Sequence, residues 1–275
     1  MKKKIAIIGT VGLPSNYGGF ETLTQNITKQ LNQKFNFTIY CSSKSYPKKL
    51  ESFNNCKLHY INLDANGISS ILYDIRSIIH ALKKSDVLLV LGVSGCIVLP
   101  FIRLISNKKI ILNIDGIEWK RKKWGIFASW FLELSEKIGV RFANEIIGDN
   151  RVIVDYINSR YNKKANLIAY GSDHVTKMKI SSFLKKKYSF LSNSYAFKVC
   201  RIEPENNIEM ILEAFSKISK VTLVIIGNWN NSEFGIQMKC KYQDFETIYL
   251  LDPIYDQDIL NQIRSNCDIY IHGHS

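Results

Sequence analysis

Short apolar runs alternate with helically spaced segments along almost the whole chain. The run at 4–9 contains four successive apolar residues from Ile5 to Ile8, which is typical of a strand buried on both faces of a parallel sheet. The segment 68–82 instead repeats isoleucine and leucine at helical spacing. Strands that alternate with helices predict right-handed βαβ crossovers and an α/β fold with a doubly wound parallel sheet.

The alternation occurs twice, and a polar, lysine-rich stretch at 171–194 separates the two series. We predict two Rossmann-like domains: an N-terminal domain at 1–172, a linker at 173–194, and a partial C-terminal domain at 195–275. The second domain is expected to be incomplete, because a doubly wound sheet needs further crossovers to cover both faces.

The composition favours an anionic partner. The chain has 37 Lys and Arg against 24 Asp and Glu, a formal net charge of +13, which attracts nucleotides or an anionic membrane surface. No helix-turn-helix, zinc-finger or aromatic RNA-binding signature is present in the sequence, so we expect no nucleic-acid partner.

The cysteines and the N-terminus indicate a reducing, cytoplasmic location. The six cysteines are scattered without a CxxC pair, a usage typical of free thiols. The basic start Met1-Lys2-Lys3-Lys4 leads through a short apolar run into a glycine-rich turn, not a signal-peptide cleavage site. The sequence contains no apolar run of the ~20 residues that a membrane span needs.

Arg201 ends an apolar strand-like run and is followed by an acidic, proline-containing turn and a helix start. A guanidinium at the C-terminal end of a strand, beside a helix N-terminus, is suited to holding a phosphate. The alternative is that Arg201 only caps the turn or pairs with Glu203 or Glu205.

Gly18 and Gly19 immediately precede a predicted helix. Adjacent glycines let the backbone approach a ligand closely, and the helix N-terminus offers free N–H groups. The alternative is a plain tight turn. The pattern is not GxGxxG, so we do not expect a nicotinamide or flavin site.

The run from Asp115 to Lys123 follows the end of a predicted strand, where doubly wound sheets place their ligands. Its carboxylates can orient a hydroxyl or act as a base, its tryptophan can stack on a sugar, and its cations can hold phosphate; these residues are Asp115, Glu118, Trp119, Lys120 and Arg121. The alternative is a solvated basic turn with one buried tryptophan.

The basic residues 120–123 precede Trp124, Phe127, Trp130 and Phe131. Basic residues beside a helically spaced aromatic face suit peripheral contact with an anionic membrane. Packing of these aromatics in the domain core is the interpretation that we weigh more heavily.

We predict no metal site. His272 and His274 are two histidines without a neighbouring cysteine or carboxylate cluster, which is too few ligands for zinc. The sequence also has no Gly-x-Ser-x-Gly elbow and no P-loop lysine, so hydrolase and ATPase functions have little support.

The chain resembles GT-B glycosyltransferases, most of all the rhamnosyltransferase-type members of glycosyltransferase family 4 that build bacterial surface polysaccharides. Four segments carry the resemblance, in the same order as in the family and over nearly the whole chain: Asn16–Thr22, Asn113–Arg121, Arg201–Asn207 and Tyr270–Ser275.

The resemblance implies an N-terminal acceptor domain and a C-terminal domain for a nucleotide-sugar donor. It places five residues at the donor: Gly18, Gly19 and Arg201 at the pyrophosphate, with Glu205 and Asn206 nearby. Such enzymes usually need no metal or other cofactor, so positive side chains and helix dipoles stabilise the leaving group.

The resemblance also implies that Asp115 is the catalytic residue, at a position where many relatives carry histidine. The acceptor side would be lined by Tyr17, Glu21, Glu118, Trp119, Lys120 and Arg121. The family assignment further implies retention at the anomeric carbon.

The chain departs from the family pattern in two places. Asn206 stands where the family often has a lysine, five positions after the arginine. Relatives also continue past the His-Gly-His-Ser segment into a glycine-rich loop and a helix with two glutamates. We therefore expect a truncated enzyme with weak or absent transferase activity.

The sequence thus predicts a cytoplasmic sugar transferase, peripheral to the inner membrane face, of capsule, O-antigen or exopolysaccharide synthesis. Its donor would be a nucleotide-activated hexose, with dTDP-rhamnose as one candidate, and its acceptor a lipid-linked saccharide. Two alternatives stay open: a sugar-nucleotide epimerase, and a non-catalytic partner in a polysaccharide synthesis complex.

Overall fold

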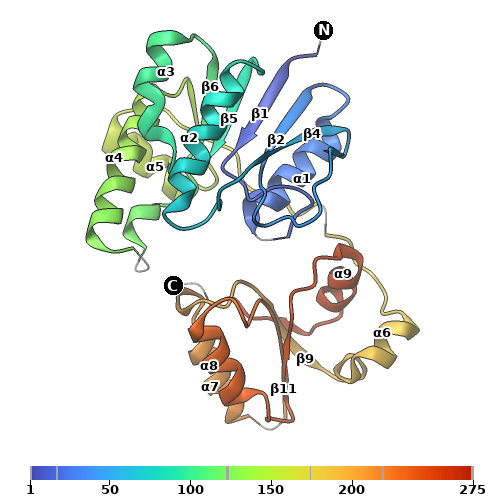
Figure 1. Cartoon of the computed structure of the whole chain (residues 1–275). Helices are drawn as coiled ribbons and strands as arrows, with labels where there is room; N and C mark the ends of the chain where they lie inside the picture. Colours follow the sequence, from blue (N-terminus) through green and yellow to red (C-terminus); the bar gives the residue numbers. More distant parts are fainter. Residues whose placement is uncertain (1, 17, 122–123, 174, 219, 274–275) are drawn as a thin grey trace. The chain divides into compact units, whose positions relative to one another are not determined.

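The computed structural model describes residues 2–16, 18–121, 124–173, 175–218 and 220–273. The chain divides into two compact units, Met1–Gly171 and Ser172–Ser275. Each unit is built around a parallel sheet with helices on both faces (Figure 1), and each is described by itself.

The sheet of the first unit has eight strands in the described part of the chain, in the order β3-β4-β2-β1-β5-β6-β7-β8. They are β1 Lys4–Ile8, β2 Asn36–Ser42, β3 Ser52–Phe53, β4 Cys56–Ile61, β5 Val87–Leu91, β6 Lys109–Asn113, β7 Glu145–Gly148 and β8 Asn166–Leu167. All pairings are parallel except β3 with β4. The strand order reverses between β1 and β5, which is the topological switch point of this sheet.

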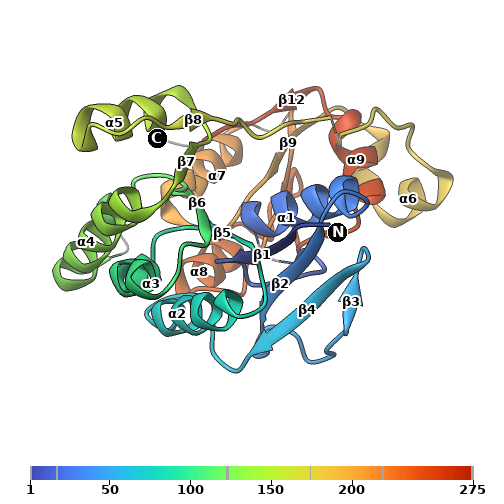
Figure 2. The ribbon, with the colours of Figure 1, turned by 90° about the horizontal axis from the view of Figure 1, so that it is seen from above.

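The helical segments of the first unit are α1 Gly19–Leu31, α2 Ser69–Leu82, η1 Cys96–Val98, α3 Leu99–Ile105, η2 Glu118–Lys120, α4 Ile126–Phe142 and α5 Arg151–Tyr161. α1 packs on one face of the sheet, against Ile7 and Ile39. α2 to α5 pack on the other face, against residues such as Leu88 and Leu112, and Figure 2 shows α2, α3 and α4 side by side. This is the doubly wound arrangement that the sequence predicts.

The second unit has four described strands in the order β11-β10-β9-β12, with parallel pairings. They are β9 Tyr195–Val199, β10 Thr222–Ile226, β11 Ile248–Leu251 and β12 Ile269–Tyr270. The helical segments are α6 Ser182–Lys187, η3 Ser189–Ser192, η4 Pro204–Asn206, α7 Ile208–Ser216, α8 Glu233–Tyr242 and α9 Gln257–Ser265. The switch point of this sheet lies between β9 and β12.

Successive residues of β9 face opposite layers, as expected for a strand. Ala196 packs in the cluster that includes residues of α7 and α8, whereas Tyr195 and Phe197 pack in the cluster that includes residues of α6 and α9. β9 is therefore covered on both faces, which explains its nearly uninterrupted apolar sequence.

The stretch predicted as a linker differs from that prediction. Leu184, Phe190 and Leu191 are buried in the second unit, and the backbone N–H of Ser181 donates to Gln262 Oε1 at 2.8 Å. Residues 181–191 thus pack as part of the second unit, because three apolar side chains reach its core from a lysine-rich stretch.

The two strands at the edges of the first sheet, β3 and β8, are only two residues long each. Among the helices of the described residues, none combines the length and the apolar character that crossing a bilayer requires.

Candidate active site

The loop that follows β1 begins at a close approach between two strand ends. Gly9 has φ +92°, and a Cβ atom there would lie 1.8 Å from the carbonyl oxygen of Leu91. Only glycine combines that backbone conformation with that proximity. The ends of β1 and β5 therefore meet at the switch point of the first sheet.

Glu21 fixes the conformation of this loop. Its side chain is buried and accepts the backbone N–H of Val11 at 2.6 Å and that of Gly18 at 2.8 Å. The hydroxyl of Tyr73, a residue of α2, donates to the carbonyl of Thr10 over a distance of 2.8 Å. Both Glu21 oxygens thus bind loop backbone, and contact of Glu21 with an acceptor stays a prediction.

Gly18 and Gly19 lie where the loop enters α1. Gly18 is the extended N-cap residue, and Gly19 is exposed with no heavy atom within 4 Å of a Cβ placed on it. The first turn of a helix has N–H groups without intrahelical acceptors, so this backbone is open to an anionic ligand. The neighbouring Tyr17, predicted at the acceptor, lies outside the described residues.

Asp115 follows β6 in a left-handed conformation, with φ +63°. Its backbone N–H donates to Oδ1 of the buried Asn113 at 2.9 Å. Aspartate tolerates this conformation better than most residues, and such backbone positions cluster at functional sites. A Cβ on the adjacent Gly116 would meet nothing within 4 Å, so the turn leaves open space beside the predicted catalytic residue.

Two residues that the sequence analysis missed lie at the same edge of the sheet. Asp149 follows β7, and burial raises the pKa of its carboxyl group. Tyr170 lies beyond the end of β8, where burial, followed by the charges of Asp115 and Asp149, raises the pKa of its hydroxyl. Asp115, Asp149 and Glu21 all lie near enough for their charges to act on the Tyr170 hydroxyl. These three carboxylates and Tyr170 thus form an acidic edge. Applying the strand-end rule to every strand would have found both residues.

The predicted acceptor residues Glu118 and Arg121 bind each other. Arg121 Nη1 lies 3.2 Å from Glu118 Oε2, and the Trp124 indole N–H donates to Glu118 Oε1 at 3.0 Å. This mutual pairing orders the turn between β6 and α4. Contact with an acceptor stays a prediction for both residues.

Trp119 is partly buried against the first core rather than standing free. Its indole N–H donates to the Tyr156 hydroxyl at 3.3 Å, and that hydroxyl donates to the buried Glu136 at 2.6 Å. The Lys120 ammonium lies 5.4 Å and the Arg160 guanidinium 5.1 Å from its ring centre. These contacts account for the partial burial of Trp119, and contact of Trp119 and Lys120 with an acceptor stays a prediction.

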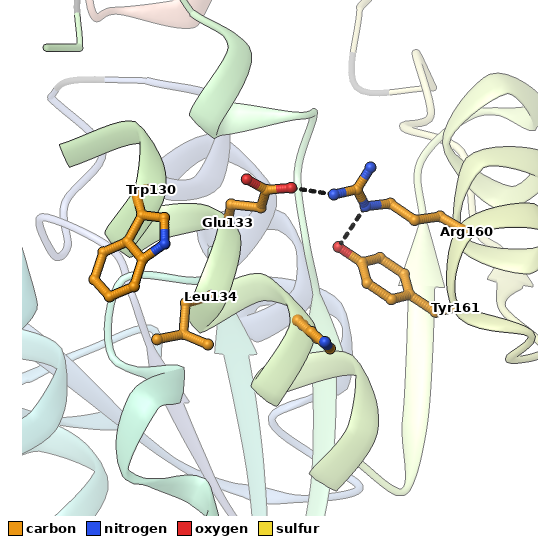
Figure 3. Close-up of a pocket in the computed structure, with 6 residues that line it drawn as sticks. Trp130, Glu133, Leu134, Arg160 and Tyr161 are labelled. Carbon is orange, nitrogen blue, oxygen red and sulfur yellow. Dashed lines mark hydrogen bonds and ion pairs between the residues drawn. The ribbon is translucent and has the colours of Figure 1, made fainter. Parts of the chain in front are cut away.

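A pocket of about 350 Å³ lies between α4 and α5 (Figure 3), lined by Trp130, Glu133, Leu134, Lys137, Arg160 and Tyr161. Arg160 forms an ion pair with Glu133 and donates its Nε–H to the Tyr161 hydroxyl at 3.2 Å. The pocket is therefore lined by one ion pair, by Lys137 and by the exposed indole of Trp130.

The aromatic residues predicted to face either a membrane or the core divide between the surface and the core. Phe127 is 87% and Trp130 64% exposed on α4, whereas Trp124 and Phe131 pack partly against the core. Lys122 and Lys123, part of the same prediction, lie outside the described residues. We call the exposed apolar side chains of these helices the α3–α4 patch: Phe101, Leu104, Ile105, Ile126, Phe127 and Trp130.

At the switch point of the second sheet, Arg201 lies just beyond β9. Its Nη1 is 3.5 Å from Glu203 Oε1, and the two side chains are 42% and 29% exposed. The ion pair that the sequence analysis left as an alternative is therefore present. Because surface pairs of this kind are weak, the guanidinium is still able to bind a phosphate.

Two asparagine amides hold the backbone around this point. Asn206 is buried and donates its Nδ2–H to the carbonyl of Arg201 at 2.7 Å. Asn207 donates to the carbonyl of Gly273 at 2.6 Å, which joins the connection after β9 to the segment after β12. Asn206 thus positions the backbone of Arg201. Direct contacts of Asn206 and of the half-buried Glu205 with a nucleotide-sugar donor stay predictions.

No group of three or more His, Cys, Asp or Glu side chains converges among the described residues in a way that would hold a metal ion. The six cysteines are unpaired thiols. The predicted independence from metal and cofactors stays a prediction.

Two parallel-sheet α/β units, each with residues suited to ligand binding at its switch point, define a GT-B-like fold. Sucrose-phosphate synthase from Thermosynechococcus elongatus matches with a TM-score of 0.78 and 12% identity, covering 100% of this chain and 77% of that one. HepE from Anabaena in complex with UDP-glucose matches at 0.72 and 14% identity, over 98% and 73%. UDP-GlcNAc 2-epimerase from Neisseria meningitidis bound to UDP-GlcNAc matches at 0.56 and 15%, over 98% and 76%.

The chain belongs to the family described as domain of unknown function DUF1972, whose model matches residues 2–173. The match covers the first unit almost completely. The comparison with curated protein sequences finds no match. At these low identities, the solved structures establish the fold, which confirms the predicted GT-B-like architecture.

Proposed function

We propose that this protein is a glycosyltransferase that moves a hexose from a nucleotide-sugar donor to a lipid-linked saccharide in surface polysaccharide synthesis. The observation that carries the proposal is the position of Arg201 at the switch point of the second sheet, in a fold shared with HepE, a protein solved with UDP-glucose.

The second unit is assigned the donor. When the bond between the anomeric carbon and the diphosphate breaks, negative charge develops on the leaving phosphate, and a guanidinium can stabilise it with charge-assisted hydrogen bonds. Arg201 supplies this group, and the open backbone at Gly18 and Gly19 is the second element assigned to the pyrophosphate.

The first unit is assigned the acceptor. A hydroxyl oxygen of the acceptor forms the new bond to the anomeric carbon and must lose its proton. Asp115, on its left-handed turn, is assigned to orient that hydroxyl and receive the proton. Asp149 and Tyr170 lie at the same acidic edge, and Glu118 and Arg121, in the turn that follows Asp115, are assigned to the acceptor as well.

Acceptor-dependent release of nucleoside diphosphate tests the proposal. The purified chain is incubated with UDP-glucose, UDP-GlcNAc or dTDP-rhamnose and a lipid-linked saccharide extract. Arg201→Ala is expected to lower the rate about 100-fold, because it removes one charge-assisted donor from the leaving group. Lys217→Ala, an exposed lysine of the same unit, is the control. No product with any donor, or full activity of Arg201→Ala, would contradict the proposal.

A sugar-nucleotide epimerase is the second candidate, because the fold also matches UDP-GlcNAc 2-epimerase at a TM-score of 0.56. The match to HepE is higher, at 0.72. An epimerase needs no acceptor. Incubation with UDP-GlcNAc alone, followed by analysis of the sugar, therefore separates the two: an isomerised sugar would support the epimerase and overturn the transferase.

A lipid-linked acceptor requires contact with a membrane, and we assign this contact to the α3–α4 patch. Largely exposed apolar side chains such as Phe127 and Trp130 supply the kind of apolar surface that interaction sites use. Lys120 and Arg121 precede α4, and cations beside apolar side chains favour an anionic bilayer interface. The patch thus combines both features of a peripheral membrane site.

Flotation with liposomes containing phosphatidylglycerol tests this assignment. The double variant Phe127→Ser/Trp130→Ser should lose most of its flotation, because both side chains are largely exposed and supply apolar area for insertion. Phe183→Ser on α6, also an exposed phenylalanine, is the control. Equal flotation of the double variant and the control would exclude the α3–α4 patch.

A further inference from the structure

Lys198 is a buried lysine near the C-terminal end of β9, an interior strand of the second sheet. Its residue is 3% exposed, and it shares a strand face with Ala196, which packs in the α7–α8 core cluster. Lysine is almost never fully buried unless it is paired, because its ammonium group carries a charge and three N–H donors that must be satisfied.

The ammonium group lies directly beneath the switch point of the second sheet. Its Nζ donates to the carbonyl of Ile271, at the end of β12, over 3.4 Å, which is long for a hydrogen bond. A Cβ placed on Gly273 would lie 3.4 Å from Nζ and 2.6 Å from the carbonyl oxygen of Asn206. The Lys198 ammonium group therefore lies next to the segment that follows β12, at the point where that segment contacts the segment after β9.

Lys198 and Arg201 place positive charge at the same strand end. Burial raises the pKa of the Cys200 thiol to about 11, and the charges of Lys198 and Arg201 both oppose that rise. Arg201 has Glu203 as an ion-pair partner, whereas Lys198 has none among the described residues. The charge of the buried Lys198 ammonium group thus has no carboxylate within the described part of the chain to offset it, and this lowers the stability of the folded protein.

We propose that Lys198 is a positioning residue of the donor site, whose buried charge attracts the diphosphate of a nucleotide sugar to the β9–β12 switch point. The inference rests on the proposed function. It explains why a lysine occupies a strand position that is otherwise apolar. A diphosphate bound above Gly273 supplies the missing negative charge, and the low dielectric around β9 strengthens the attraction.

This role predicts a specific pattern of affinities. The charge acts on phosphate and not on the nucleoside, so Lys198→Met should weaken binding of UDP, dTDP or ADP by at least about tenfold. Binding of the matching nucleoside should not change. Lys198→Arg, which keeps the charge, should retain most of the preference for the diphosphate. Lys217→Met removes an exposed lysine from the same unit and is the control for net charge.

Calorimetry with each nucleoside diphosphate and its nucleoside measures these affinities, and thermal unfolding of the unliganded variants provides the second readout. Methionine nearly matches the length of lysine and carries no charge, so Lys198→Met should unfold at the same or a higher temperature than the wild type.

Three outcomes would overturn the inference. Wild-type affinity of Lys198→Met for the diphosphate would show that the charge is not used. A lower unfolding temperature, with equal loss of diphosphate and nucleoside binding, would show that Lys198 only supports the fold. Failure of the wild type to bind any of the three diphosphates would overturn the donor assignment itself, and the inference with it.

Discussion

The two sheets differ in the charge of the side chains that follow their strands. The edge of the first sheet gathers acidic and hydroxyl groups, among them Asp115, Asp149 and Tyr170. The edge of the second sheet gathers the cations Lys198 and Arg201. The carboxyl ends of parallel strands thus supply only the place for a ligand, whereas the side chains decide its chemistry: the carboxylates after the strands of the first sheet suit hydroxyl groups, and the cations at the second sheet suit phosphate.

The two edges also differ in how their loops are held. In the first unit, the carboxylate of Glu21 and the hydroxyl of Tyr73 bind the loop backbone from below. In the second unit, the amides of Asn206 and Asn207 join one connecting segment to another. The first loop therefore depends on one buried charge, and the second on neutral hydrogen bonds.

The largest expected effect tests the close approach between the ends of β1 and β5 at Gly9. Gly9→Ala should lower the free energy of unfolding by about 3 kcal/mol or more, because its Cβ clashes with the Leu91 carbonyl and its φ is left-handed. Urea unfolding measures this change. Gly19→Ala, where the space is open, should change stability by less than about 1 kcal/mol. Equal stability of the two variants would show that the first switch point is not closely packed.

The second effect tests the buried charge beneath the first loop. Glu21→Gln keeps one acceptor oxygen but turns an amide NH2 toward a backbone N–H, so the free energy of unfolding should fall by about 2 kcal/mol. Glu213→Gln, on the surface of α7, is the control. If Glu21→Gln instead keeps its stability and loses transferase activity, the carboxylate serves the acceptor, and the contrast between the two loops fails.

Much of the fold could be predicted because buried parallel strands have a distinctive sequence. The run from Ile5 to Ile8 is apolar throughout, and its central residues are covered on both faces of the sheet. The stretch at 173–194 could not be read in this way. Leu184, Phe190 and Leu191 lie between lysines and serines in short helical segments, where no periodicity distinguishes a buried side chain from a linker residue.

The candidate site could be predicted only where unusual residue types follow a strand. Asp115 and Arg201 stand out for that reason, whereas Asp149 and Tyr170 follow their strands in ordinary sequence. The contacts between side chains could not be predicted from the sequence either. The sequence supplies a tryptophan at position 119, but only the fold brings Tyr156 and Arg160 of α5 to it.

The smallest expected effect sharpens the comparison of the two edges through pH. Burial raises the pKa of Asp149 in the folded protein above its unfolded value of 3.8. The folded state therefore binds more protons, and the wild type loses stability as pH rises from the unfolded pKa through the folded pKa. Asp149→Asn removes this penalty, so it should be more stable than the wild type at pH 7, by less than about 1 kcal/mol because the group is partly solvated.

Urea unfolding of both proteins from pH 3.5 to pH 7 measures the difference, which should shrink toward zero at the acidic end. Asp155→Asn on α5 is the control for a change of net charge, and its difference from the wild type should not follow this trend. If Asp149→Asn gains stability and loses acceptor-dependent turnover, the first edge keeps a destabilising carboxylate for function, in the way that we propose for the buried ammonium group of Lys198 at the second edge. If stability rises while turnover is unchanged, Asp149 lies at the acidic edge without a role there.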